Sequence, residues 1–190
     1  MGFSPGFQML HAPQQIRTFL ITAVTWQRRA LFKAEPFAHL FLDTLARYRD
    51  QGRFQLHEFV LMPDHFHALI TPAYEVSLEK AVQLIKGGFS FRAKRELGSS
   101  LEIWQEGFTE HRVKGAEDFE RHAIYIRDNP VRAHLAESAE EYPYGSFGAG
   151  MKRDPTPPWL KPPKETNREV AGLKASASTE GLKSGASTVR

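Results

Sequence analysis

The sequence predicts an α+β domain in which a four-stranded antiparallel sheet carries helices. Three observations lead to this fold class. Stretches of β-branched and aromatic residues alternate with stretches whose apolar residues recur every three or four positions. The 190 residues are 41% hydrophobic, which is enough for one core of ordinary size. Composition changes near Gly148, so we divide the chain into a folded domain, residues 1–147, and a Pro/Ser/Gly-rich tail, residues 148–190, predicted to be disordered.

The first half of the domain is predicted to hold a strand, a helix and a hairpin. Residues 16–26, IRTFLITAVTW, have the composition of a strand. Between residues 34 and 52 an apolar stripe runs along one helical face and Gly52 closes the helix. Residues 54–62 and 66–71 are predicted strands joined by the turn signal Pro63-Asp64.

The second half is predicted to add a helix, a short strand and a last helix. The first helix starts at the N-cap candidate Ser77 and runs to about Leu97, with a weak point at Gly87-Gly88. Residues 108–115 are a short strand, and residues 116–129 form a helix that Pro130 stops. The first six elements of this β-α-β-β-α-β-α order match the split βαβ, ferredoxin-like arrangement, with two helices on one face. The extra C-terminal helix carries Tyr125 and is left to cover or approach the sheet.

Composition excludes several classes of protein. The chain has no cysteine, so any metal must be held by histidine, carboxylate or amide groups. The longest apolar run near the start, FLITAV, is too short to cross a bilayer, so we expect a cytoplasmic protein with no membrane partner. The formal charge of +3 comes from the tail, because the first 147 residues hold 17 bases and 18 acids. Only local clusters can therefore argue for nucleic-acid binding.

The segment LMPDHFHALITP contains two histidines within a predicted strand. His65 and His67 project to one side of the strand and Phe66 to the other, so the two imidazoles can converge on one ion. A histidine on a half-buried strand is, however, more often packed or hydrogen-bonded than metal-bound. The strand has a wholly apolar face and a mixed face: Phe66, Ala68 and Ile70 against His65, His67, Leu69 and Thr71. We expect the histidines on the open side of the sheet, where such folds commonly meet a ligand.

Two residues of the last helix are also candidates. Tyr125 and Asn129 are four residues apart and share one helical face. Asn129 directly precedes Pro130, where an amide side chain often caps the backbone. Tyr125 has an alternative structural role as a packed tyrosine beside Phe119 and His122.

Contacts to DNA are predicted from local basic clusters. The segment KGGFSFRAKRELG combines Lys86, Arg92, Lys94 and Arg95 with two phenylalanines that could stack on bases. A solvated helix face above core phenylalanines is the alternative. The further candidates are Arg28, Arg29, Arg112, Lys114 and Arg132.

Four blocks together resemble a known family. FVLMPDHFHALITP, AVQLIKGGFSFRAKRELG, IWQEGFTEHRV and YIRDNPVRAHL follow one another as in the REP-associated tyrosine transposases, relatives of the single-tyrosine transposases among the His-hydrophobic-His endonucleases. The resemblance covers about residues 14–147. It implies that His65, His67 and Asn129 bind a divalent metal ion and that Tyr125 is the nucleophile. His111 also matches a family-typical position without an assigned role. The family usually has glycine where this chain has His134, which could alter the turn after the last helix.

The resemblance implies a metal-dependent endonuclease and strand transferase. Its substrate would be single-stranded, hairpin-forming palindromic DNA, cleaved through a covalent 5′-phosphotyrosine intermediate. The ligand set leaves Mg²⁺ and Mn²⁺ both open, and relatives include monomers and homodimers. Two alternatives stay open: a phosphoesterase that uses activated water, and a non-catalytic ferredoxin-like nucleic-acid-binding module derived from a transposase.

Overall fold

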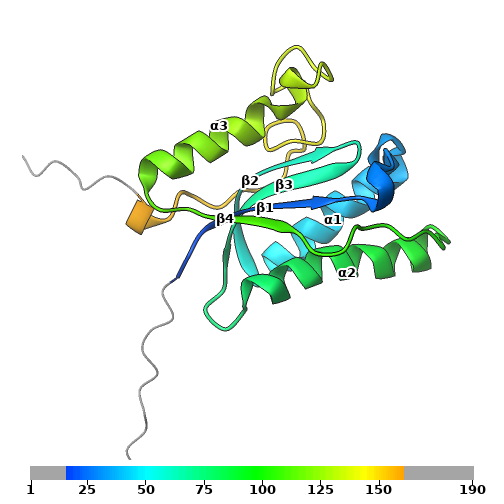
Figure 1. The fold of residues 1–190 in the computed structure, drawn as a ribbon, viewed down its shortest axis with the longest axis horizontal. Helices are drawn as coiled ribbons and strands as arrows, with labels where there is room; N and C mark the ends of the chain where they lie inside the picture. Colours follow the sequence, from blue (N-terminus) through cyan, green and yellow to red (C-terminus); the bar gives the residue numbers. More distant parts are fainter. Residues whose placement is uncertain (1–15, 161–190) are drawn as a thin grey trace, which may run out of the picture.

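The chain forms a four-stranded antiparallel sheet with helices on both faces (Figure 1). A computed structural model describes residues 16–160. The strand order is β2-β3-β1-β4, which is the order of the predicted split βαβ arrangement, so the predicted fold class is confirmed. The strands are β1 (Phe19–Val24), β2 (Phe54–Met62), β3 (His65–Pro72) and β4 (Thr109–Arg112).

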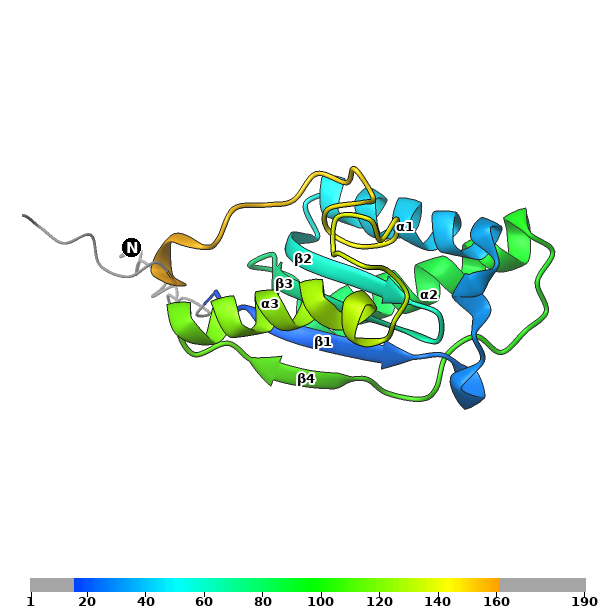
Figure 2. The same ribbon diagram turned by 90° about the horizontal axis from the view of Figure 1, so that it is seen from above.

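The helices divide between the two faces of the sheet (Figures 1 and 2). Two helices, α1 (Glu35–Asp50) and α2 (Leu78–Glu96), pack side by side on one face. The third, α3 (Ala116–Arg132), crosses the opposite face and contacts β2 and β3. Short 3-10 turns lie between β1 and α1, at Trp26–Arg28 and Leu31–Lys33, and at Pro158–Leu160.

The alternation of side chains along β3 builds two cores. Phe66, Ala68 and Ile70 belong to the large core beneath α1 and α2, as their apolar pattern predicts. Leu69 points the other way, into a smaller core that includes Ile126 of α3. The prediction that the histidine face is open was wrong, because α3 covers it and leaves His67 only 6% exposed. The sequence pattern shows which side chains share a face but not what packs on that face.

The glycine pair of α2, predicted as a weak point, does not interrupt the helix. The helix runs without interruption from its Ser77 cap, whose hydroxyl accepts the Lys80 amide, to Glu96. Gly88 instead makes room for α1, since a Cβ atom there would lie 2.5 Å from Cε2 of Tyr48. Gly87 faces open space. Of the two glycines, only Gly88 is therefore needed for the packing of α2 against α1.

The last helix continues through Pro130 to Arg132, so its predicted end at residue 129 was three residues short. Proline lacks one amide donor, and a loss this close to the end of a helix costs one hydrogen bond without breaking it. His134 then adopts φ +55°, the left-handed region that favours glycine. His134 and Leu135 donate to the carbonyls of Val131 and Pro130, which closes the helix in a Schellman turn. The turn that glycine would make is thus formed with histidine.

Residues 148–160 pack on the domain, so the predicted tail begins too early. The Asp154 amide donates to the Leu56 carbonyl, and the Asp154 carboxylate accepts from Arg49. Leu160 is buried in the smaller core. Disorder predicted for the rest of the tail, residues 161–190, lies outside the described residues. Among residues 16–160, no helix is long and apolar enough to cross a membrane.

Candidate functional site

The two histidines and the tyrosine meet between β3 and α3. The rings of His65 and His67 lie 4.8 Å apart between centroids and are nearly perpendicular. The ring of Tyr125, from α3 of the same chain, lies 5.3 Å from that of His67. Tyr125 is 36% exposed, so part of the residue is accessible to solvent. Residues sixty positions apart in the sequence therefore form one cluster.

Both histidines are held through the same ring atom. Nδ1 of His67 lies 2.6 Å from the hydroxyl oxygen of Thr22 on β1, the residue paired with it across the sheet. Nδ1 of His65 lies 2.6 Å from Oδ1 of Asp64, and because a carboxylate only accepts, the imidazole is the donor. In both rings the hydrogen bonds that the described residues make use Nδ1. Nε2 is thus the atom left to bind an ion.

Burial and neighbouring charges shift the pKa values of His67 and of Asp64, the carboxylate beside His65. Burial lowers the pKa of His67 to about 3, and the neighbouring His65 adds to this effect. His67 is therefore neutral near pH 7 and keeps a lone pair for coordination. Burial raises the pKa of Asp64, but hydrogen bonds and charge from His65 and Arg28 outweigh it, and the net pKa falls. Asp64 thus stays ionised between Arg28 Nη1, at 3.2 Å, and the His65 ring.

Asn129 lies one turn beyond Tyr125 on α3, as the spacing predicts. Its Nδ2 donates to the Tyr125 carbonyl at 2.8 Å. This bond fixes the amide against the helix and uses its nitrogen, so the oxygen is the atom that could serve as a ligand. The geometry does not bring Asn129 into a hydrogen bond with either histidine.

The Arg132 guanidinium lies over the ring of Tyr125, the nucleophile candidate. Arg132 is three residues after Asn129, and its guanidinium carbon lies 5.6 Å from the centroid of the Tyr125 ring. A cation over an aromatic face is attracted by the ring, and this one also adds positive charge beside the tyrosine. Arg132 and Arg28 are the two predicted DNA contacts that flank the candidate site.

The other predicted DNA contacts lie elsewhere or are engaged within the protein. Lys86 donates to the carbonyls of Gln105 and Gly107, and burial lowers its pKa. Arg92 binds Glu96 and Asp43, and ties α2 to α1. Lys86, Arg92, Lys94 and Arg95 all belong to α2, on the sheet face opposite to Tyr125. The remaining three, Arg29, Arg112 and Lys114, are exposed.

A buried carboxylate fastens α3 to the sheet near the site. Glu58 of β2 is 3% exposed, and its Oε1 accepts from Arg127 and from Arg153, both at 2.7 Å. Both guanidinium groups also lie over the ring of Phe147, at 5.6 and 4.7 Å from its centroid. The segment after α3 therefore takes part in holding the helix that carries Tyr125.

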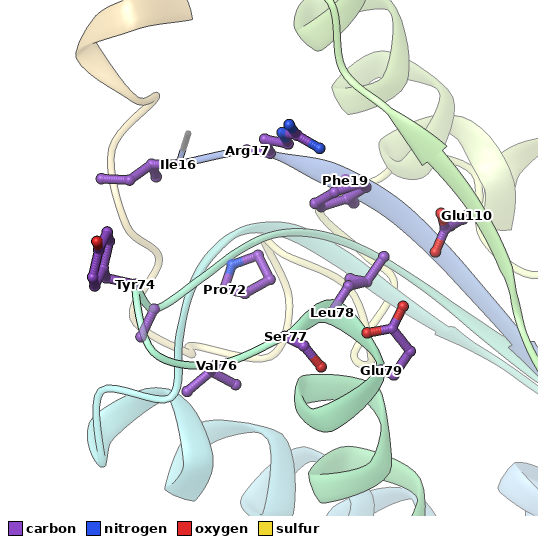
Figure 3. Close-up of a pocket in the computed structure, with 11 residues that line it drawn as sticks. Ile16, Arg17, Phe19, Pro72, Tyr74, Val76, Ser77, Leu78, Glu79 and Glu110 are labelled. Carbon is purple, nitrogen blue, oxygen red and sulfur yellow. The ribbon is translucent and has the colours of Figure 1, made fainter. Parts of the chain in front are cut away.

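A cavity lies at the other end of β1 (Figure 3). Arg17, Phe19, Tyr74, Glu79 and Glu110 are among its lining residues, and its volume is about 380 Å³. Phe19 pairs with Ile70, whereas the histidines pair with Thr22 and Val24 near the opposite end of the strand. The candidate site between β3 and α3 is therefore separate from this cavity.

Two supporting residues were not found from the sequence. Thr22 could not be found, because its contact with His67 depends on the pairing register of β1 and β3. Asp64 directly precedes His65, and a carboxylate beside a candidate metal ligand was a signal that could have been used.

Comparisons with known proteins identify the family of the chain and support its fold. The model of the family described as "Transposase IS200 like" matches residues 17–129, more than half of the chain. The REP-associated tyrosine transposase of Escherichia coli (strain K12) is 26% identical over 147 residues, covering 73% of this chain and 86% of the relative. The structure of a REP-associated tyrosine transposase bound to a REP hairpin matches with a TM-score of 0.61 at 19% identity. It covers 93% of this chain and 100% of the other, and supports the fold. This chain therefore belongs to the IS200-like transposase family, as a tyrosine transposase similar to the REP-associated members.

Proposed function

We propose that this transposase cleaves and rejoins single-stranded DNA at hairpin-forming palindromes through a covalent bond to Tyr125. The observation that carries the proposal is the placement of the Tyr125 ring against His67, 5.3 Å away, within one chain. A nucleophile beside two fixed imidazoles is the arrangement that phosphoryl transfer at a metal site requires. One chain supplies both parts, so the proposed site does not need a partner subunit.

The proposed reaction is a transesterification. The Tyr125 oxygen attacks the scissile phosphorus, the bond from phosphorus to the 3′-oxygen breaks, and a 5′-phosphotyrosine forms. The phenolic proton leaves to solvent, and the departing 3′-oxygen takes up a proton. The number of phosphoester bonds is unchanged, so a DNA 3′-OH can later attack the intermediate and join strands without ATP.

The donor set fits a divalent ion. His65, His67 and the Asn129 oxygen would hold it, and it would supply positive charge to the scissile phosphate. Imidazole and amide ligands are neutral, so they do not reduce that charge. Thr22 and Asp64 fix the orientation of the two rings through hydrogen bonds to their Nδ1 atoms. Imidazole ligands suit Mn²⁺ better than Mg²⁺, and both ions are candidates.

The proposed substrate is supported by the relative that was solved with a REP hairpin. In this chain, Arg28 and Arg132 flank the cluster and are mostly solvent-facing, so both can meet phosphates. The surface along α3 therefore suits DNA better than the α2 face, where Lys86 and Arg92 bind protein groups.

The test uses labelled hairpin oligonucleotides from the flanks of the gene, incubated with Mg²⁺ or Mn²⁺ and resolved on a denaturing gel. We expect a covalent protein–DNA adduct that disappears in Tyr125→Phe, since phenylalanine keeps the ring but removes the attacking oxygen. Retained hydrolysis without an adduct would identify a phosphoesterase that uses activated water. Binding without cleavage, unchanged in His65→Ala/His67→Ala, would identify a non-catalytic module.

A further inference from the structure

A second group of metal-ligand side chains lies between β4 and α3. It consists of His111 on β4 and Asp118 and His122 on α3, and their ligand atoms all lie within 4.8 Å of one another. Nε2 of His111 is 3.1 Å from Oδ2 of Asp118, and Nε2 of His122 is 3.3 Å from Oδ1. The two imidazole rings are 4.6 Å apart between centroids. Two imidazoles and a carboxylate thus converge on one point.

The backbone holds these side chains in place. Asp118 and His122 are four residues apart and share one face of α3. His111 pairs with Leu20, whose side chain packs with the smaller core, so His111 also faces α3. The Asp118 carboxylate accepts from the Lys114 amide at 3.0 Å, which fixes it at the start of the helix. The cluster is therefore built from two rigid elements.

One atom of the cluster lacks a partner. Nε2 of His122 is buried and makes no hydrogen bond among the described residues, although Asp118 Oδ1 is 3.3 Å away. The distance is short enough, but the alignment does not make a hydrogen bond. A buried, unpaired ring nitrogen costs free energy, and an ion between imidazole and carboxylate would remove that cost.

Arg121 forms an ion pair with Asp118 that a bound metal ion would have to replace, and this ion pair is exposed. Arg121 donates to Asp118 Oδ1 at 2.8 Å, but its side chain is 66% exposed. Exposed ion pairs contribute little stability, so an ion can displace the guanidinium. His111 is half exposed, which gives an ion a path into the site from solvent.

We propose that His111, Asp118 and His122 bind a first-row divalent transition-metal ion of the Zn²⁺ class, which fastens β4 to α3. Two imidazoles and a carboxylate are ligands that Zn²⁺ accepts, and the group needs no cysteine. The site is separate from the His65/His67 pair. His67 aligns across β1 with Thr109 of β4, so the sites are separated by two strand spacings, roughly 10 Å, and two residues along β4.

The ion would act on the helix that carries Tyr125. His122 and Asp118 precede Tyr125 by three and seven residues on the same helix. Fastening the first half of α3 to the edge strand would restrict the position of Tyr125 without any contact between the ion and DNA. This positioning role does not depend on the chemistry proposed for His65 and His67.

The test begins with the full chain carrying His65→Ala and His67→Ala, which removes the other candidate ligands. We expect it to bind one equivalent of Zn²⁺ in calorimetry, to show a Co²⁺ absorption spectrum, and to melt at a higher temperature when Zn²⁺ is added. Adding His111→Gln should abolish all three effects. His111 is on an exposed edge strand, so this change leaves the fold intact.

Matched variants separate this site from general histidine binding. His39→Gln, an exposed histidine on α1, should leave Zn²⁺ binding unchanged. His122→Gln should lower affinity at least tenfold, as removal of a ligand requires. The proposal is overturned if the double-alanine chain binds no Zn²⁺, or if His111→Gln binds it with the same stoichiometry and affinity.

Discussion

The hydroxyl of Thr22 lies 2.6 Å from Nδ1 of His67, on the side of the imidazole away from the atom left for a metal ion. Thr22 and His67 are paired residues of β1 and β3, so the sheet register itself sets the orientation of the ring. A partner behind a metal-binding histidine fixes its tautomer and its direction. Thr22 is therefore a supporting residue of the proposed metal site.

The first prediction concerns that partner. Thr22→Val keeps the shape of the side chain but leaves Nδ1 of a buried histidine without its hydrogen bond. We expect the Mn²⁺ concentration needed for adduct formation to rise by about 10- to 100-fold, the usual loss for such a partner. Thr109→Val is the control, because Thr109 is the exposed neighbour of Thr22 on β4. Equal metal dependence in both variants and the parent chain would contradict the role of Thr22.

The second prediction concerns which cations meet DNA. Arg132→Gln removes the charge 5.6 Å from the Tyr125 ring, whereas Lys94→Gln removes an exposed charge from α2 on the other face. For a single-stranded oligonucleotide, we expect Arg132→Gln to make the slope of log affinity against log salt shallower by about 0.7. Lys94→Gln should leave the slope unchanged. The reverse result would mean that DNA crosses the α2 layer.

The order of the elements could be predicted from the sequence because each depends on local spacing. The stripe on α1, the alternation along β3 and the Ser77 cap each lie within one short segment. The candidate cluster was predicted from the family resemblance of its blocks, since no local pattern says that α3 lies over β3. For that reason the sequence did not reveal that α3 packs over the face of β3 that carries His65 and His67.

The sequence also did not reveal polar contacts between residues that are far apart along the chain. The segment 148–160 has the composition of a tail, yet Asp154 and Arg153 bind Arg49 and Glu58 of the domain. Charged side chains that pair with distant groups leave no apolar pattern. Composition therefore marked the change near Gly148 but not the end of the folded part.

The third prediction concerns the contact that holds α3 through this segment. Arg153→Met removes one of the two arginines that donate to the buried Glu58 carboxylate. We expect the free energy of unfolding to fall by about 1–3 kcal/mol, the cost of a lost hydrogen bond to a buried charged group. Amides of α3 should also exchange faster with solvent. The exposed neighbour Lys152→Met should change stability by less than about 0.5 kcal/mol, and an equal loss there would contradict the assignment.

The fourth prediction compares the two glycines of α2. Gly87→Ala adds a methyl group into open space and should stabilise the protein by about 0.5–1 kcal/mol, because alanine favours the helix. Gly88→Ala places its Cβ 2.5 Å from the Tyr48 ring, so α1 must shift. We expect Gly88→Ala to be about 1–3 kcal/mol less stable than Gly87→Ala in urea unfolding. Equal stabilities would mean that Tyr48 moves aside freely.

The fifth prediction follows the stability of the domain into acid. Burial raises the pKa of Asp154, but the Arg49 guanidinium and the Leu56 amide outweigh it, and the net pKa falls. A carboxylate with a depressed pKa in the folded state stabilises that state above its unfolded pKa, near 3.9. That contribution is lost as the pH falls through the folded value. Asp154→Asn should therefore cost about 1.5–3 kcal/mol of unfolding free energy between about pH 5 and 7, and progressively less below about pH 4.

The control for the acid experiment is another partner of the same arginine. Asp50 also accepts from Arg49, at 2.8 Å, but its side chain is 67% exposed. Solvent screens such a pair, so Asp50→Asn should cost less than about 0.5 kcal/mol at every pH. Urea unfolding of the parent and both variants from pH 7 to pH 3 measures the two differences. A cost for Asp154→Asn that stays constant down to pH 3 would contradict a role for the carboxylate charge in holding residues 148–160 to the sheet. No cost at any pH would assign that role to the backbone contact of Asp154 with Leu56, which the substitution leaves intact.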